Sequence, residues 1–294
     1  MEIFGIPSPA FFGQLLLGLI NGSFYAILSL GLAIIFGLLN IINFAHGAQY
    51  MVGAFVAWMG FTWLGIGYWW ALILSPLVVG AVAVVIERTM LKQLYKLDHL
   101  YGLLLTFGLA LMAEGVFKNY FGVSGESYEV PELLQGGINL GFMYLPIYRA
   151  WVVVAAMTVC FSAWYAIERT SLGATLRAAT QRPDLVQALG INVPVLLTAT
   201  YAVGAGLAAF AGVLAAPIMQ VNPVMGSNLI IVVFAVVVIG GMGSIFGSIV
   251  TGLGLGVVEG LTKVFYPEAS AVVIFVVMVL VLLVKPAGLF GKQA

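Results

Sequence analysis

Charged residues are scarce in this sequence: Asp, Glu, Lys and Arg together make up 7% of its 294 residues. An ordinary soluble domain has about 25%. Hydrophobic residues make up 63%, and the remaining polar residues are too few to cover the surface of a water-soluble globule of this length. The scarcity of charge therefore excludes a soluble protein and predicts an integral membrane protein.

Cysteine and histidine are almost missing as well. The one cysteine, Cys160, lies in an apolar run without a partner, so the sequence holds no disulfide framework and no thiolate metal site. The two histidines, His46 and His99, show no metal-ligand spacing and belong to no nucleophile–base arrangement. We therefore expect no metal, no cofactor and no catalytic residues, and we expect the protein not to be an enzyme.

Three further absences narrow the class of protein. The net charge is zero and no basic cluster is present, which argues against nucleic-acid binding. No basic residue precedes Arg88, and the N-terminal apolar run is longer than a signal-peptide core, so we expect no removable signal peptide. No Gly-x-x-x-x-Gly-Lys-[Ser/Thr] phosphate loop occurs, so we expect this chain not to bind ATP itself.

Long hydrophobic segments are what the sequence does contain. A membrane-spanning helix needs about 20 apolar residues. Nine segments suggest such helices: 11–39, 46–64, 69–91, 100–121, 147–167, 194–216, 225–242, 245–263 and 269–285. The junction of the first two, Asn40 to Gly47, is ambiguous, so eight crossings are the alternative. The sequence predicts an all-α, polytopic bundle of eight or nine transmembrane helices, forming one membrane domain over residues 1–294.

The positions of Lys and Arg predict the orientation, because these residues concentrate in cytoplasmic loops. With nine crossings and the N-terminus outside, eight basic residues fall inside and three outside. Those inside are Arg88, Lys92, Lys96, Arg169, Arg177, Arg182, Lys285 and Lys292, and those outside are Lys118, Arg149 and Lys263. We predict a cytoplasmic C-terminus, an external loop at 122–146 and a cytoplasmic loop at 168–193. With eight crossings, the N-terminus moves inside.

Small residues recur at every fourth position in three of the segments, which places them on one face of a helix. The three ridges are Ser244, Ser248, Gly252, Gly256 and Gly260; Gly204, Ala208, Gly212 and Ala216; and Gly18, Gly22 and Ala26. Small residues let the backbones of membrane helices approach closely. We expect these ridges to pack helices together rather than to contact a solute.

The cytoplasmic loop is the most polar stretch of the chain. Pro183 does not fit inside a helix, since it lacks a backbone donor and clashes with the preceding turn. It fits the first turn of a second short helix, Asp184 to Leu189, which Gly190 would end. This pattern indicates a helix–turn–helix on the cytoplasmic surface. A plain solvated loop is the alternative.

Three stretches of the chain resemble one family. SLGATLRAATQRPDLVQALGIN (171–192) is similar to the cytoplasmic coupling loop of the branched-chain amino acid ABC transporter permeases. NIINFAHGAQYMVGAF (40–55) resembles that family's signature near the end of its first helix, and VVIGGMGSIFGSIVTG (237–252) resembles its Gly-rich segment. The chain looks like the shorter of the family's two permeases. One departure is Ala48, where many relatives carry an acidic residue.

The resemblance implies an importer of branched-chain amino acids in a bacterial-type inner (plasma) membrane. Its partners would be a second, longer permease, two cytoplasmic ATPase subunits that bind the ATP, an external solute-binding protein and the lipid bilayer. The implied coupling residues are Arg177, Ala178, Gln181, Asp184, Ala188, Leu189 and Gly190. The alternatives are a permease for urea, short amides or another small polar solute, and a self-sufficient secondary transporter or channel.

Two groups of polar residues lie near membrane depth. Asn43, His46 and Gln49 interrupt the apolar pattern between the first two segments. They either line the solute pathway on a half-broken helix or cap helix ends in a polar turn at the cytoplasmic surface. Glu114 with Lys118, and Glu259 with Lys263, have the spacing of i,i+4 ion pairs. A contact with the solute is the alternative for these pairs.

Overall fold

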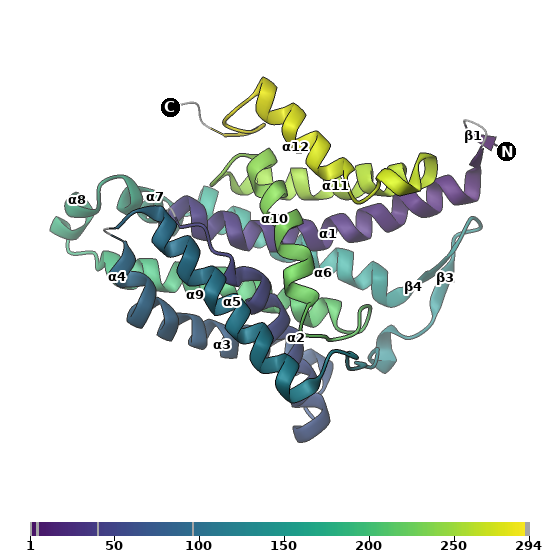
Figure 1. Ribbon diagram of the computed structural model, residues 1–294, viewed down its shortest axis with the longest axis horizontal. Coiled ribbons are helices and arrows are strands. Elements are labelled where there is room, and N and C mark those ends of the chain that lie inside the picture. The colour runs from purple at the N-terminus through teal and green to yellow at the C-terminus, as the bar shows by residue number, and fades with distance from the viewer. Residues whose placement is uncertain (1, 4–5, 40, 96, 292–294) are drawn as a thin grey trace.

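The computed structural model describes residues 2–3, 6–39, 41–95 and 97–291. Asn40, Lys96 and Lys292, which entered the sequence predictions, lie outside the described residues. Most of the described chain is helical, and the helices pack into one elongated bundle (Figure 1). The prediction of an all-α membrane bundle is confirmed.

Each of the nine predicted segments coincides with a helix. The helices are α1 (Ser8–Leu39), α2 (Ala45–Leu64), α3 (Tyr68–Ile86), α5 (His99–Phe121), α6 (Ile147–Arg169), α9 (Val193–Ala215), α10 (Met225–Gly240), α11 (Ile245–Phe265) and α12 (Val273–Val284). Within the described part of the chain, six helices are long and apolar enough to cross a membrane: α1, α3 with its extension to Leu94, α5, α6, α9 and α11. Because α10 and α12 are shorter and α2 carries polar residues in its first two turns, the number of crossings stays a prediction.

Shorter elements connect these helices. A π-helix, η1 (Glu87–Leu91), and α4 (Lys92–Leu94) prolong α3, while α7 (Ser171–Gln181) and α8 (Pro183–Ala188) form the loop before α9. Two 3₁₀ turns are η2 (Glu132–Leu134) and η3 (Pro267–Ala269). Strands β1 (Glu2–Ile3) and β2 (Ile6–Pro7) pair antiparallel, as do β3 (Gly137–Asn139) and β4 (Tyr144–Pro146), whose register sets Ile138 opposite Leu145.

Helix α1 forms the centre of the bundle, where it packs against α6, α9, α10 and α11 (Figure 1). Almost every residue from Ile20 to Ile35 is buried, whichever side of the helix it occupies. A helix that is apolar on all sides belongs in the interior of a bundle. The sequence of α1 meets this condition, and its small residues let the neighbouring helices come close.

The ridge on α11 lies directly against the ridge on α1. A Cβ built on Gly256 would be 2.3 Å from the Cα of Gly22, and one built on Gly260 would be 2.9 Å from the Cα of Gly18. Further along, the Ser29 hydroxyl donates to the Ser248 carbonyl at 3.2 Å. These distances show that the two backbones touch.

The remaining ridge residues divide between packing and capping. Gly252 of α11 packs against the backbone of Ala26. Gly212 of α9 packs against Tyr50 on α2, since a Cβ built on Gly212 would lie 2.2 Å from the Tyr50 carbonyl oxygen. Ser244 lies outside the helical ridge to which the spacing assigned it. It is the N-cap of α11, and its hydroxyl oxygen accepts the backbone N–H of Gly247 at 3.1 Å.

The two ends of the bundle hold the two long connections. At one end the rings of Phe12 and Phe142 are 5.8 Å apart, which places the start of α1 beside the 137–146 hairpin. At the other end the Thr180 hydroxyl of α7 donates to the Leu38 carbonyl of α1 at 3.4 Å. The start of α1 therefore lies at the same end of the bundle as the 122–146 connection. Nine crossings require this arrangement, because they place both the N-terminus and that connection outside.

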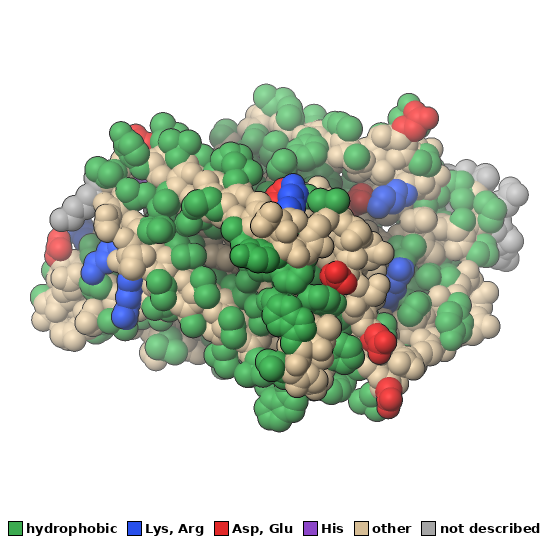
Figure 2. All heavy atoms as spheres, turned by 60° about the horizontal axis from the view of Figure 1, so that its bottom comes forward, with side chains coloured by type: hydrophobic (Ala, Val, Ile, Leu, Met, Phe, Trp, Pro, Cys, Tyr) green, Lys and Arg blue, Asp and Glu red, His purple; other side chains and the backbone are tan. Residues whose placement is uncertain are grey.

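Hydrophobic side chains are spread over the face of the molecule that Figure 2 shows. Large apolar residues such as Leu104, Val154 and Leu283 are exposed on the outward faces of α5, α6 and α12. Exposed apolar surface of this extent is stable against lipid and not against water. Which end of the bundle faces the cytoplasm stays a prediction from the Lys and Arg positions.

Candidate functional site

The connection between α1 and α2 turns back into the bundle. Nε2 of His46, in the first turn of α2, is 2.9 Å from the Leu28 carbonyl, well before the end of α1. Gly31 makes room for this ring, since a Cβ there would lie 2.9 Å from Cε1 of His46. Helix α2 therefore begins inside the protein, at the depth of Leu28.

Non-helical backbone at membrane depth is tolerated where protein surrounds it and satisfies its polar groups. Thr106 of α5 does this for the α1–α2 connection. Its hydroxyl oxygen accepts the backbone N–H of Phe44 at 3.1 Å, and the hydroxyl lies 3.2 Å from the Ile42 carbonyl. One threonine on a neighbouring helix thus stabilises the break.

Asn43, His46 and Gln49 are buried, each less than a tenth exposed. The Asn43 amide donates to Oε1 of Gln49 at 3.4 Å, and Nε2 of Gln49 donates to the Tyr201 hydroxyl at 3.2 Å. The N-cap of α2 is Phe44, and no side chain caps it. The expected capping turn at the surface is therefore wrong, because these side chains bond across helices in the interior.

The face of α2 that carries Gly47, Ala48 and Met51 lines a groove. Its other walls are α5 and the start of α10, and the lining residues are Phe44, Gly47, Ala48, Met51, Phe107, Ala110, Leu111, Glu114, Pro223, Gly226, Ser227 and Ile230. Asn43, His46 and Gln49 are not among them. The structure thus places these three pathway candidates beside the groove, one layer behind its α2 wall.

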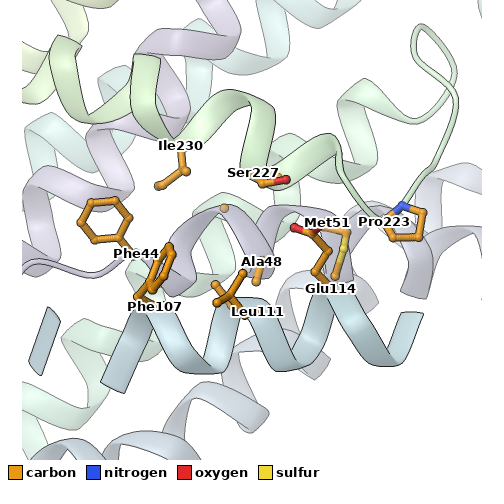
Figure 3. A pocket seen from close by; sticks show the side chains of 12 residues that line it. Phe44, Ala48, Met51, Phe107, Leu111, Glu114, Pro223, Ser227 and Ile230 are labelled. Atoms are coloured by element: carbon orange, nitrogen blue, oxygen red, sulfur yellow. The ribbon is translucent and has the colours of Figure 1, made fainter. Parts of the chain in front are cut away.

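The two polar side chains of the groove lie away from its aromatic end. Figure 3 shows Phe44 and Phe107 together at that end, with Ser227 and Glu114 farther along and Met51 and Pro223 beyond them. The two phenylalanine rings are 6.1 Å apart, edge to face. The volume of the groove is about 50 Å³, which holds a few water molecules and no amino acid.

Both predicted i,i+4 ion pairs are confirmed. Nζ of Lys118 is 2.6 Å from Oε1 of Glu114, which lines the groove. Nζ of Lys263 is also 2.6 Å from Oε1 of Glu259, whose Oε2 accepts the Tyr25 hydroxyl of α1 at 2.7 Å. The second pair therefore ties α11 to α1, while the first presents charge to the groove.

At the other end of the bundle, α7 and α8 form the predicted helix–turn–helix. Pro183 is the first residue of α8, which ends at Ala188. Gly190, two residues after that end, adopts a φ of +83°, a conformation that favours glycine. Ala179, Val186 and Val193 pack together on the inner side. The predicted two-helix loop is confirmed, and the plain solvated loop is wrong.

The outer side of this pair carries apolar side chains that no other part of the described chain covers. Leu185 is 60% exposed and Leu189 is 80% exposed, with Ala188 exposed between them. Of the other predicted coupling residues, Ala178, Gln181, Asp184 and Gly190 are exposed. Arg177 instead turns back: it donates to the Ile167 carbonyl and lies 3.8 Å from Glu168, which holds α7 against α6.

Sequence reasoning missed one buried acid, Glu87, in the π-helix that prolongs α3. Its side chain is 1% exposed and accepts hydrogen bonds from Tyr95 and Thr198. Arg88 follows Glu87 directly, and a pair of charged residues is typical of the polar end of a membrane helix. This pattern therefore places Glu87 at the polar end of the helix rather than in the buried interior. Its position inside the apolar segment 69–91 was the signal that could have found it.

Comparison with known proteins identifies the family. A family model described as "Branched-chain amino acid transport system / permease component" matches residues 14–282. The chain is 30% identical to the Escherichia coli K12 high-affinity branched-chain amino acid transport system permease protein LivH, over 96% of each chain. It is 32% identical to the Pseudomonas aeruginosa protein BraD, named likewise, over 95% of each chain.

Similarity extends to a second kind of permease. The chain is 25% identical to the Escherichia coli K12 permease protein LivM, over 90% of this chain and 67% of that longer one. No solved structure matches the chain. The family match and the long apolar helices together identify the chain as a multi-pass inner-membrane transport component rather than an enzyme. The chain belongs to the family of branched-chain amino acid transport system permease components.

Proposed function

We propose that this protein is the shorter permease subunit of an ATP-driven importer of branched-chain amino acids. In this proposal two ATPase subunits bind the ATP at the cytoplasmic end, a second, longer permease completes the solute pathway, and an external solute-binding protein delivers the amino acid. The relatives named above, and the family match over residues 14–282, support this assignment.

The exposed outer side of α8 is the feature that supports a contact with the ATPase subunits. Leu185, on the six-residue helix α8, and Leu189, directly after that helix, are largely exposed at the end of the bundle. A short helix with an apolar side fits a groove on a partner protein. The exposed charges of Arg182 and Asp184 flank that side and would orient the contact more than they strengthen it.

The size of the groove supports a second permease. The groove has walls on α2, α5 and α10 only, and its volume of about 50 Å³ is too small for an amino acid. A second subunit that faces these helices would supply the missing wall. Similarity to LivM, which is longer than this chain, fits a pair of related but unequal permeases.

The chemistry of the groove favours an apolar amino acid over urea or a short amide. Only Glu114 and Ser227 among its lining residues have polar side chains, and the others are apolar or glycine. Urea and amides need several hydrogen-bonding groups, whereas a branched side chain gains from contact with Phe44 and Phe107. The carboxyl group of Glu114 suits the ammonium group of an amino acid.

The test is uptake of radiolabelled leucine by proteoliposomes that contain this chain, the longer permease, both ATPase subunits and the binding protein. We expect leucine uptake to require ATP, and we expect that urea does not inhibit it. Ala188→Trp should abolish uptake and recovery of the ATPase subunits, because a large side chain blocks the contact of α8. Gln93→Trp, an exposed position on α4 at the same end, is the matched control.

Two results would overturn the proposal. Uptake at the same rate without ATP would indicate a self-sufficient secondary transporter or channel. Normal uptake and normal ATPase recovery with Ala188→Trp would show that α8 makes no functional contact, since its exposed side would then tolerate a bulky obstacle.

A further inference from the structure

Glu87 is a buried acid that the groove and the α7–α8 pair do not use. It lies where α3 changes into the π-helix Glu87–Leu91, within the 27-residue apolar span Tyr68–Leu94. It is about 28 Å along the helix from Tyr68 at about 1.5 Å per residue, which places it near one edge of a hydrocarbon layer that the span crosses. A carboxyl group buried there is costly unless hydrogen bonds satisfy it.

Two hydroxyl groups satisfy it, and they come from different elements. The Tyr95 hydroxyl, just after α4, donates to Oε1 at 2.5 Å. The Thr198 hydroxyl, in the second turn of α9, lies 2.6 Å from Oε2. Among the residues that the structure describes, no Lys or Arg forms an ion pair with Glu87. The carboxyl group thus joins the end of α3 to the start of α9.

The start of α9 is continuous with the α7–α8 pair. Val193, the first residue of α9, packs against Ala179 of α7 and Val186 of α8. Asn192 caps α9 by accepting the backbone N–H of Val195 at 3.2 Å. A force applied to the exposed side of α8 therefore reaches the first turns of α9 through packed side chains.

One turn beyond Thr198, α9 contacts the helix that lines the groove. The Tyr201 hydroxyl accepts Nε2 of Gln49 on α2 at 3.2 Å, and Tyr201 is fully buried. Gly47 and Ala48, on another side of the same turns of α2, form the groove wall. Within one turn, α9 is thus bonded to α3 through Glu87 and to α2 through Tyr201.

We propose that Glu87 is a positioning residue, which fixes α9 to the π-helix of α3 so that a displacement of α8 passes through Tyr201 and Gln49 to the groove wall on α2. This inference rests on the proposed function, because it assumes that α8 contacts the ATPase. Without the Glu87–Thr198 bond, α9 would shift relative to α3 and less of each displacement would reach α2.

The structure offers a matched pair of threonines for the test. Thr198 and Thr200 are both buried on α9, and each hydroxyl also lies near a carbonyl one turn back, Pro194 at 3.0 Å and Leu196 at 2.9 Å. Replacing either with Val removes that intrahelical bond and keeps the shape. Only Thr198→Val also removes the contact with Glu87.

The measurement is leucine uptake per ATP hydrolysed by the purified, assembled transporter in proteoliposomes. We expect about a fivefold fall in this ratio for Thr198→Val, which is what loss of one hydrogen bond does to an equilibrium. Thr198→Ser should restore the ratio, and Thr200→Val should leave it unchanged. Tyr201→Phe should lower it in the same way, because the phenylalanine cannot bond to Gln49.

Each outcome is decisive. Absence of ATP-driven uptake by the wild type would refute the proposed function itself. With an active wild type, an unchanged ratio in Thr198→Val, or equal falls in Thr198→Val and Thr200→Val, would overturn the inference. If Thr198→Val does not assemble, Tyr201→Phe and Glu87→Leu decide, since leucine cannot bond to either hydroxyl. Wild-type ratios in both variants would refute the role of Glu87.

Discussion

Replacing Gly256 with Ala should destabilise the protein, although Ala favours a helix over Gly by about 1 kcal/mol. The added Cβ would lie 2.3 Å from the Cα of Gly22 and 2.4 Å from the Gly18 carbonyl oxygen. Two carbon atoms are in favourable contact at about 3.5–4.0 Å, so α1 and α11 must separate by more than 1 Å. Overpacking of this kind costs about 1–3 kcal/mol, and the backbone of buried α1 yields little.

The magnitude lies near the upper end of that range, since the obstacle is backbone and not the end of a flexible side chain. After the gain in helix propensity, we expect a net loss of about 2 kcal/mol for Gly256→Ala. Gly254 is the control, because a Cβ on it meets nothing within 4 Å. Gly254→Ala should therefore be neutral or stabilise the protein by up to about 1 kcal/mol.

The assay is denaturant unfolding of the purified protein in detergent micelles, followed by circular dichroism. Gly256→Ala should unfold at a lower denaturant concentration than the wild type, and Gly254→Ala at the same or a higher one. Equal midpoints for the two variants would refute the reasoning, because the α1–α11 contact would then have room for a methyl group. Gly256→Leu, which adds far more volume, should give little folded protein.

Four other outcomes are expected. A periplasmic-side reporter should be active when inserted in 122–146 and inactive when fused at the C-terminus; the reverse pattern would contradict the predicted orientation. The buried Tyr128 hydroxyl has no partner among the described residues, so Tyr128→Phe should stabilise the fold by about 1 kcal/mol. Burial also raises the pKa of Tyr128 to about 12, so the wild type should lose stability above about pH 10, and Tyr128→Phe should remove that loss. Tyr148→Phe, which loses bonds to Tyr68 and Leu214, should destabilise it in the same unfolding assay. Ala48→Trp should fill the groove and stop leucine uptake while the ATPase subunits still bind, and normal uptake would separate the groove from the solute pathway.

The features that could be predicted from the sequence depend on neighbours along the chain. Apolar length defines the helices, the four-residue spacing of Gly252, Gly256 and Gly260 defines a packing face, and Pro183 with Gly190 defines the limits of α8. Each of these is a local property of backbone or side-chain size. Such properties hold whichever helices surround them.

The features that could not be predicted depend on residues far apart in the chain. Whether His46 is buried or at the surface depends on the space beside Gly31, and the partner of Gln49 is Tyr201 on α9. The groove joins residues from α2, α5 and α10, none of which is unusual in its own segment. Glu87 was hidden for the same reason, since Thr198 satisfies it from another helix.

The contact between α1 and α11 also affects the order of events during synthesis. Tyr25 and Glu259, which bond across this contact, are separated by 234 residues. At a synthesis rate of about 5–20 residues per second, α11 is made about 10–50 s after α1. During that time its glycine ridge faces lipid or a temporary helix. A chain that stops before α11 leaves this ridge open, so such fragments should be preferred substrates of membrane quality-control proteases.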